Sequence, residues 1–431
     1  MTAEISAHVL VVNFKKAAHK GNRKKFANSL IFHLHIFSHF PAINLAAPLK
    51  IITFGGVVDC YLLWRVEPDA PAIQEQEKVY TILIPKDTTL MAIISIVIFI
   101  MSLIPMTGVS SPNYVEQLQI GQTTEKSGKY QNPIINASLP DPSIIKAQDG
   151  LFYLYATENI RNLPIYRSEN LVDWDYVGTA FDDESRPKWN PNGRIWAPDI
   201  NFFDGQYVLY YSKSVWGGEW TCGIGVATAV SPKGPFTDRG ALFISEDIGV
   251  RNSIDPFFME DGGKKYVFWG SFHGINGIEL TDDGLAVKPG SAPVPIAGNQ
   301  MEGSYIHKRG DYYYLFGSNG SCCEGANSTY QVVYGRSKSL FGPFLTKEGQ
   351  PMLEGHYNVL LHGNEKVAGP GHNAEFITDD KGKTWMLYHG YLKSDPDAGR
   401  QVFMDKVEWI DGWPVVAGSE PSSNGSSPSI E

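Results

Sequence analysis

The sequence predicts an all-β fold, specifically a five-bladed β-propeller, and three observations support this class. One short aromatic strand pattern occurs five times, at separations of 47 to 72 residues. Turn-forming residues are abundant, with 43 glycines and 27 prolines in 431 residues. An acidic or histidine side chain stands shortly before each aromatic strand. Repeats of about 50 residues that each hold several short strands are typical of propeller blades.

The repeated pattern is an aromatic residue, any residue, an apolar residue, a second aromatic residue, any residue and a small residue. Its copies read FYLYAT, YVLYYS, YVFWGS, YYLFGS and WMLYHG, and they begin at Phe152, Tyr207, Tyr266, Tyr313 and Trp385. These residue types favour strands, glycine-containing turns closely precede four copies, and a second strand pattern follows each copy. A β-sandwich would not produce this period, so each copy is expected to mark one blade.

The N-terminal part differs from the repeats. Residues 1–90 show no recognisable domain, whereas residues 90–111 carry no charge and contain an apolar core of the length found in signal peptides. Either translation starts near Met91, so that residues 1–90 lie upstream of the true start and cleavage falls before Ser111, or residues 90–106 remain as a signal anchor in the membrane. Both interpretations make the following domain secreted, periplasmic or extracellular.

The remaining boundaries follow from the repeats and from composition. The propeller is expected to span residues 129–417, which contain all five copies of the pattern. Residues 418–431 are rich in serine, proline and glycine, and this composition predicts a disordered tail.

Composition and motifs exclude several classes of protein. The formal net charge of -10 argues against nucleic acid as a partner. Four cysteines are too few for a disulfide scaffold and show no zinc-binding spacing, although the adjacent Cys322 and Cys323 are compatible with either a disulfide or two thiols. The chain has no nucleophilic serine elbow and no phosphate-binding glycine loop.

Acidic residues stand at nearly the same place in four repeats. They lie 8 to 11 residues before the first aromatic of the pattern (152−141, 207−199, 266−255 and 313−302), and they are Asp141, Asp199, Asp255 and Glu302. The fifth repeat has His372 and Glu375 instead. This place corresponds to the start of the innermost strand, so the side chains are expected to converge at one end of the propeller axis. Asp-Pro turns that cap each strand are the alternative, but they do not explain Glu302, which no proline follows.

Clustered carboxylates indicate acid–base chemistry. Mutual repulsion raises at least one pKa in such a cluster, which provides a general acid and a general base at one pH. An acid pair in a groove lined with aromatic rings suggests glycoside cleavage. Trp196, Trp216 and Trp220 are expected near one end of the second blade, where they would stack on sugar rings or pack between blades.

These motifs resemble those of the family 43 glycoside hydrolases, which are five-bladed propellers that act on arabinose and xylose polymers. The resemblance covers about residues 132–416 and is closest to the arabinan endo-1,5-α-L-arabinosidases, or endo-arabinanases. Two strings carry it most specifically: GSCCEGANSTYQVVYGRS at residues 320–337 and GPGHNAEF at residues 369–376. At the predicted acid the chain reads MEGSYI, whereas members of the group often have Glu-Ala-Pro.

The resemblance implies an inverting mechanism with three catalytic carboxyl groups. Asp141 would be the general base that activates water, Glu302 the general acid, and Asp255 the residue that tunes the pKa of the acid. Together with the tryptophans, the resemblance predicts as substrate-binding residues Trp196, Trp216, Gly217, Asn252, Ser253, Ile254, Ser271, Phe272 and His273. Asp199 has no assigned chemical role and is expected to be a structural contact or a substrate-binding contact. It also implies that His372 binds a metal, commonly calcium, together with water, in a structural or electrostatic role.

The leading hypothesis is therefore a secreted endo-arabinanase whose partners are arabinan polysaccharide or oligosaccharides. An exo-acting α-L-arabinofuranosidase or a β-xylosidase on the same propeller is the first alternative, because the loops that close one end of a groove decide between exo and endo action. A non-catalytic sugar-binding propeller is the second alternative. That hypothesis needs one member of the acid pair to be missing, and both are present.

Overall fold

The computed structural model describes residues 128–430 and, before them, the backbone of five strands. These parts belong to two separate units, Met1–Ile120 and Gly121–Glu431. The predicted signal peptide or anchor at residues 90–111 lies outside the described residues. Within the parts that are described, no helix is both long enough and apolar enough to cross a membrane.

The first unit contains a five-stranded antiparallel sheet. Its strands occur in the spatial order β1-β2-β5-β4-β3. Their bounds are β1 (Val12–Phe14), β2 (Ser29–Phe37), β3 (Leu49–Thr53), β4 (Gly56–Trp64) and β5 (Glu77–Pro85). Apolar and aromatic residues that favour strands dominate these segments. The sequence analysis found no recognisable domain in residues 1–90, so it did not anticipate this sheet.

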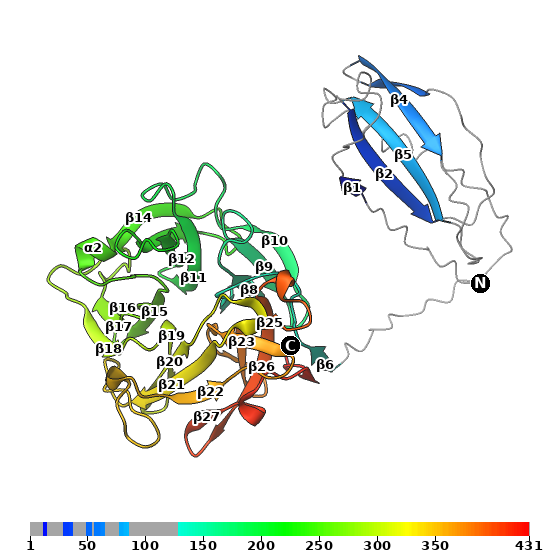
Figure 1. Cartoon of the computed structure of the whole chain (residues 1–431). Coiled ribbons are helices and arrows are strands. Elements are labelled where there is room, and N and C mark those ends of the chain that lie inside the picture. The colour runs from blue at the N-terminus through cyan, green and yellow to red at the C-terminus, as the bar shows by residue number, and fades with distance from the viewer. Residues whose placement is uncertain are drawn as a thin grey trace, which may run out of the picture. The chain divides into compact units, whose positions relative to one another are not determined.

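The second unit is a five-bladed β-propeller, which confirms the predicted fold class (Figure 1). The first blade consists of β7 (Ser143–Lys146), β8 (Phe152–Tyr155), β9 (Pro164–Ser168) and β10 (Asp175–Thr179). The second blade consists of β11 (Arg194–Phe203), β12 (Gln206–Ser214), β13 (Gly223–Ala229) and β14 (Thr237–Ile244). The third blade consists of β15 (Phe257–Asp261), β16 (Lys264–Trp269), β17 (Ile275–Glu279) and β18 (Val294–Ala297). The fourth blade consists of β19 (Glu302–Arg309), β20 (Tyr312–Asn319), β21 (Gln331–Ser337) and β22 (Asn358–Leu361). The fifth contains β23 (Val367–Gly371), β24 (Ile377–Thr378), β25 (Thr384–Leu392), β26 (Gln401–Ile410) and β27 (Trp413–Val415).

The five aromatic repeats form the second main strand of each blade, namely β8, β12, β16, β20 and β25. Their rings fill the space between neighbouring blades. Tyr155 of the first blade and Tyr211 of the second, for example, lie in one buried cluster with Phe181 and Phe236. Full burial of one such side chain stabilises a fold by roughly 1.5–3 kcal/mol. The aromatic pattern therefore recurs because each blade must bury both faces of its sheet.

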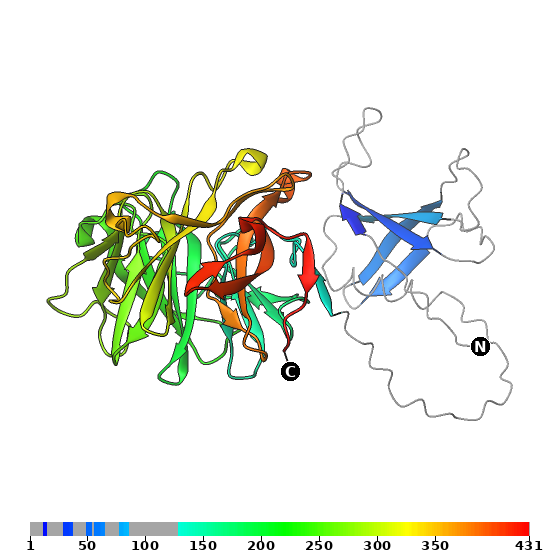
Figure 2. The ribbon, with the colours of Figure 1, turned by 90° about the horizontal axis from the view of Figure 1, so that it is seen from below.

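The two ends of the second unit close the ring at the fifth blade. β6 (Lys129–Gln131) pairs with β28 (Asn424–Ser426), and the Asn132 side chain bonds to the backbone of Met404 in β26. Figure 2 shows the same unit turned by 90°, with the C-terminus beside the fifth blade. The predicted disorder of residues 418–431 is wrong for the described part of that tail, because backbone pairing with β6 compensates for its polar composition.

Candidate active site

A residue in the left-handed backbone region lies just before or inside the innermost strand of each of the first four blades, and directly after β23 in the fifth. The φ angles are 55° at Asp141, 38° at Ala197, 59° at Asp255, 60° at Gly303 and 46° at His372. Residues other than glycine rarely adopt positive φ, and such strain is concentrated at functional sites. The five innermost strands surround one axis (Figure 1). The contacts of His372 with Asp141 and of Gly303 with Asp255 show that these positions meet at the same end of the propeller.

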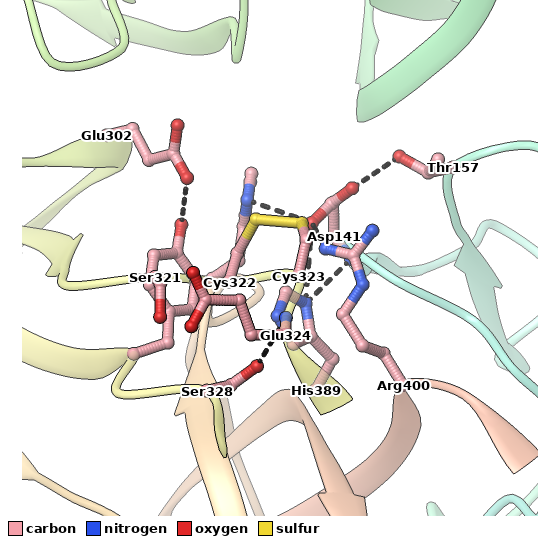
Figure 3. The surroundings of a disulfide bond; sticks show 12 residues. Asp141, Thr157, Glu302, Ser321, Cys322, Cys323, Glu324, Ser328, His389 and Arg400 are labelled. Atoms are coloured by element: carbon pink, nitrogen blue, oxygen red, sulfur yellow. Dashed lines mark hydrogen bonds and ion pairs between the residues drawn. A yellow bond between two sulfur atoms is a disulfide. The ribbon is translucent and has the colours of Figure 1, made fainter. Parts of the chain in front are cut away.

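Asp141 is held as an anion by groups of the first and fifth blades (Figure 3). The Arg400 guanidinium donates to Oδ1 of Asp141 at 3.0 Å, and the Thr157 hydroxyl donates to Oδ2 at 2.6 Å. His372 Nδ1 lies 3.3 Å from the same Oδ1. Burial alone would raise the pKa of Asp141, but Arg400 and then His372 outweigh it and hold that pKa well below its ordinary value. An ionised carboxylate can accept a proton, as a general base must.

Backbone contacts explain why Arg400 and Thr157 reach Asp141. The Leu139 N–H donates to the Arg400 carbonyl at 2.8 Å, where the N-terminal segment lies along the fifth blade. The Ala197 N–H of the second blade donates to the Thr157 hydroxyl at 2.8 Å. The sequence analysis named neither Arg400 nor Thr157, because nothing in their own segments distinguishes them from ordinary polar loop residues.

His389 is another site residue that the sequence analysis did not name. The Asp141 N–H donates to its Nδ1 at 3.0 Å, which requires that nitrogen to be unprotonated. Burial and the nearby Arg400 lower the pKa of His389 well below its ordinary value, in agreement with a neutral ring. The ring also stacks on Tyr330, with centroids 5.6 Å apart. A sequence signal for His389 exists, since it stands in the fifth aromatic repeat where the other copies have Ala, Tyr or Gly.

Glu302 is the first residue of β19 and accepts two hydrogen bonds from side chains. The Ser271 hydroxyl donates to Oε2 at 2.6 Å, and the Tyr330 hydroxyl donates to Oε1 at 2.7 Å. Burial raises the pKa of Glu302, and these two hydrogen bonds offset only part of that effect. Glu302 therefore favours the protonated form much more than Asp141 does, which suits it to donate a proton.

Asp255 lies between the second and fourth blades. Its N–H donates to the Ser212 hydroxyl at 2.8 Å, and its Oδ2 accepts from the Gly303 N–H at 3.2 Å, next to Glu302. Burial raises the pKa of Asp255 to about 8, against the opposing charge of His372 and with a further contribution from Glu302. The site thus combines one ionised carboxylate with two carboxyl groups that retain protons more readily, and this combination permits general acid–base catalysis.

The predicted metal ligand His372 lies where positive charge is favoured. Burial would lower the pKa of His372, but Asp141 and then Asp255 and Glu302 raise it to about 9. Within residues 128–430, no group of three or more His, Cys, Asp or Glu side chains is placed to hold a metal ion. Calcium takes six to eight oxygen ligands, so water would have to supply most of the coordination of a cation bound at His372. The adjoining Asn373 has a buried Oδ1 without a hydrogen-bond partner.

Three predicted substrate-binding residues come from the second blade and differ in exposure. Trp216 is 83% exposed and Gly217 is exposed, and both lie in the loop between β12 and β13. Trp196 is half-buried in β11. This loop lies at the active-site end, because Ser214 at its start pairs with Arg194 at the start of β11.

Two predicted residues of the third blade form a hydrogen-bond chain that ends at Glu302. The Asn252 amide donates to the Ser271 hydroxyl at 2.9 Å, and Ser271 in turn donates to Glu302. Phe272 is half-buried, and His273 Nε2 lies 3.5 Å from a carboxylate oxygen of Glu219.

The intervening residues of the same motif are buried in the fold. Ser253 is fully buried and accepts a hydrogen bond from the Trp269 indole, while Ile254 is 8% exposed. Their role in this structure is to support the Asn252–Ser271 contact, whereas the side chains of Asn252 and Ser271 are the polar groups beside the acid.

The sequence analysis expected Asp199 at the start of an innermost strand, and this expectation is wrong. β11 begins at Arg194, and Ala197, the residue of the second blade with a positive φ angle, lies inside that strand, two residues before Asp199. Its side chain is buried, with 3% of the residue exposed, and its Oδ2 accepts from the Phe258 N–H at 2.8 Å. The shorter spacing of Asp199 from its aromatic repeat, 8 residues against 11 for the other acids, reflects this difference.

Asp199 and Glu375 form a buried carboxyl pair inside the propeller. Burial and then the charge of Glu375 raise the pKa of Asp199 well above its ordinary value, and burial also raises the pKa of Glu375. Glu375 accepts hydrogen bonds from the Ser143 hydroxyl at 2.9 Å and the Ile144 N–H at 2.8 Å. The pair therefore joins the first, second and fifth blades and holds a proton that the unfolded chain would release.

Asp199→Asn is expected to make stability less dependent on pH. A carboxyl group whose pKa is raised on folding contributes most below its unfolded pKa of about 3.9, and that contribution is lost as pH rises through the folded pKa. The unfolding free energy of Asp199→Asn minus that of wild type should increase between pH 5 and pH 8. The increase should be up to about 1.4 kcal/mol for each pH unit. Urea denaturation at several pH values measures this, with the exposed Glu354→Gln as control. Parallel curves for Asp199→Asn and wild type would contradict the shared proton.

A propeller that gathers, at one end of its axis, one carboxylate with a lowered pKa and two carboxyl groups with raised pKa values has the acid–base groups that a glycoside hydrolase uses. The chain belongs to the glycosyl hydrolases family 43, whose sequence model matches residues 130–414. The resemblance found in the sequence is thereby confirmed.

Relatives within the family include enzymes with two modes of action. The chain is 34% identical to the extracellular exo-α-(1→5)-L-arabinofuranosidase ArbA of Cellvibrio japonicus, over 66% of this chain and 87% of the relative. It is also 34% identical to the extracellular endo-α-(1→5)-L-arabinanase 1 of Bacillus subtilis, over 65% of this chain and 88% of the relative. A solved structure of Cellvibrio cellulosa α-L-arabinanase with arabinohexaose is similar at 32% identity and a TM-score of 0.60, covering 65% and 95% of the two chains.

Proposed function

We propose that this protein is a secreted, inverting hydrolase that cleaves internal α-1,5-L-arabinofuranosidic bonds of arabinan. The observation that carries the proposal is the contrast between Asp141, held ionised by Arg400, and Glu302, whose pKa burial raises. The names of the relatives support arabinan as the substrate, and two of them are described as extracellular, which supports secretion.

Each carboxyl group has one task in the proposed mechanism. Asp141 accepts a proton from a water molecule as that water attacks the anomeric carbon, and Arg400 and Thr157 keep the carboxylate oriented. Glu302 donates its proton to the departing glycosidic oxygen while Ser271 and Tyr330 fix its side chain. The water replaces the leaving group from the opposite side of the ring, so the anomeric configuration inverts.

Exo-acting cleavage on the same residues is the second candidate, favoured by the similarity to the exo-acting enzyme from Cellvibrio japonicus. Digestion of linear 1,5-arabinan, with products separated by chain length over time, distinguishes the two modes. A spread of short oligosaccharides at early times is the result expected for endo action. Arabinose or one short product alone from the first time point would replace the proposal with exo action. No product from folded protein would contradict both.

We also propose that a hydrated cation such as calcium binds at His372, where it would supply fixed positive charge beside the carboxyl groups. The ring nitrogen that does not face Asp141 would be its protein ligand, with water completing the coordination.

His372→Ala is expected to lose most of the calcium that the wild-type chain retains after gel filtration, because the described residues around His372 offer no closed set of other ligands. Elemental analysis of the eluted protein measures the ratio of metal to chain. His273→Ala, which alters a histidine paired with Glu219 instead, should retain the wild-type ratio. Equal metal content in His372→Ala and wild type would remove His372 as the ligand.

A further inference from the structure

A disulfide between adjacent residues lies beside the catalytic carboxyl groups. Cys322 and Cys323 are bonded to each other in the loop between β20 and β21, residues 320–330. Because Glu302 at the start of β19 pairs with Ser318 near the end of β20, this loop lies at the active-site end. Figure 3 shows Asp141 among the side chains that surround the two sulfur atoms, with Glu302 on the other side of the bond in that view.

This disulfide contributes little to the stability of the fold. A disulfide stabilises a protein mainly by restricting the chain between the two cysteines, and here no residue lies between them. Nor is the bond part of the interior, since Cys323 is exposed, Cys322 is half-buried and neither belongs to a buried hydrophobic cluster. The bond instead offers an apolar surface near Asp141 (Figure 3).

The loop that carries the disulfide is held closely against the fifth blade. A Cβ atom on Gly369 would lie 2.6 Å from Ser328 Cβ, and one on Gly371 would lie 2.2 Å from the Tyr330 ring, so only glycine permits this contact. Hydrogen bonds from the Ser321 and Thr329 backbone N–H groups to each other's hydroxyl oxygens close the base of the loop. The two strings that define the family resemblance, GSCCEGANSTY and GPGHNAEF, therefore pack together as one wall of the site.

The chemistry of the site indicates what this wall would contact. Asp141, Arg400, Glu302 and His372 provide charged or hydrogen-bonding groups, which suit the hydroxyl groups of a sugar. A furanose ring also has a face formed by C–H groups, and that face requires an apolar surface. Disulfide sulfur atoms are polarizable, lack a strong hydrogen-bonding group and cannot change rotamer freely while bonded. A rigid apolar surface costs little conformational entropy on binding.

We infer that the Cys322–Cys323 disulfide is a specificity-determining contact, which packs against the C–H face of the sugar ring bound between Asp141 and Glu302. This inference rests on the proposed function and specifies how its substrate is held. The disulfide touches sugar but transfers no proton. Its loss should therefore weaken binding of the sugar and leave the chemical step nearly unchanged.

The test compares KM and kcat on linear 1,5-α-arabinotriose for the oxidised wild-type chain, the same chain treated with dithiothreitol, and the Cys322→Ser/Cys323→Ser double variant. Dithiothreitol transfers two electrons and two protons to the disulfide, giving two thiols and its own cyclic disulfide. KM should rise on the order of tenfold in both altered forms, equivalent to about 1.4 kcal/mol of lost contact. The kcat should stay within about twofold. Reduction of already folded protein covers the case in which the double variant fails to fold.

Controls separate the disulfide from other effects. Cys222, a buried free cysteine, is changed to serine, and this variant should keep the wild-type KM and its response to dithiothreitol. Alkylation with iodoacetamide before and after reduction counts the thiols by mass. Two reactive thiols at positions 322 and 323 before reduction, an unchanged KM, or a fall in kcat at constant KM would each overturn the inference. Oxidised wild-type protein that cleaves no arabinan substrate would instead overturn the proposed function, and this inference with it.

Discussion

Asp141→Asn is expected to lower kcat on arabino-oligosaccharides by about 1,000-fold or more, because general base catalysis contributes 100- to 10,000-fold and the neutral amide accepts no proton. The change retains the size of the side chain and an oxygen that can accept from Thr157. It removes the ion pair with Arg400, whose charge keeps the pKa of Asp141 low. The propeller should remain folded, since its core lies between the blades and not at this end of the axis.

Stability measurements on the same variant provide an independent check. A carboxyl group whose pKa is lowered on folding stabilises the protein above its unfolded pKa, and that contribution is lost as pH falls through the folded value. Asp141→Asn should therefore unfold more readily than wild type at pH 7, with the difference shrinking below about pH 4. Circular dichroism and urea denaturation measure fold and stability, and Asp175→Asn, an exposed carboxyl of the same blade, is the control. Near-normal kcat in the variant, or loss of the β-sheet signal, would contradict the role assigned to Asp141.

The sequence predicted the blades and the three carboxyl groups that meet at one end of the axis because both depend on local repetition. A blade must present aromatic side chains at fixed positions to bury its faces, so the pattern is repeated in the chain itself. Asp141, Asp255 and Glu302 could be found because each keeps a nearly constant distance from its aromatic strand. Asp199 had a shorter distance and proved to lie inside a strand, in a contact between blades.

The partners of the carboxyl groups could not be predicted because they come from distant parts of the chain. Arg400 lies 259 residues after Asp141, and their contact exists only because the ring closes at the fifth blade. Tyr330 and Ser271 reach Glu302 from different blades. Ser271 was expected to contact the sugar, but nothing in either segment indicates a contact with Glu302. Such contacts determine which carboxyl group is ionised, so assigning base and acid from physical chemistry required the fold.

The strongest test of the acid is the dependence of Glu302→Gln on the leaving group. Natural arabinan linkages release an alkoxide that must be protonated, so the variant should lose about 1,000-fold or more in kcat on arabinotriose. Dinitrophenyl arabinofuranoside releases a stabilised phenolate, so the loss on that substrate should be within about tenfold.

The dependence of the cleavage rate on pH provides a second measurement of the role of Glu302. Burial raises the pKa of Glu302 in the wild-type enzyme, and its deprotonation should set the alkaline limb of the rate profile on arabinotriose. The variant with the aryl substrate should lack that limb, while the acid limb set by Asp141 remains at low pH. Equal losses on both substrates would mean that Glu302 positions substrate or solvent and that another group, with Asp255 nearest in chemistry and pKa, donates the proton. A loss confined to arabinotriose would identify Glu302 as the proton donor, because only the demand for protonation differs between the two leaving groups.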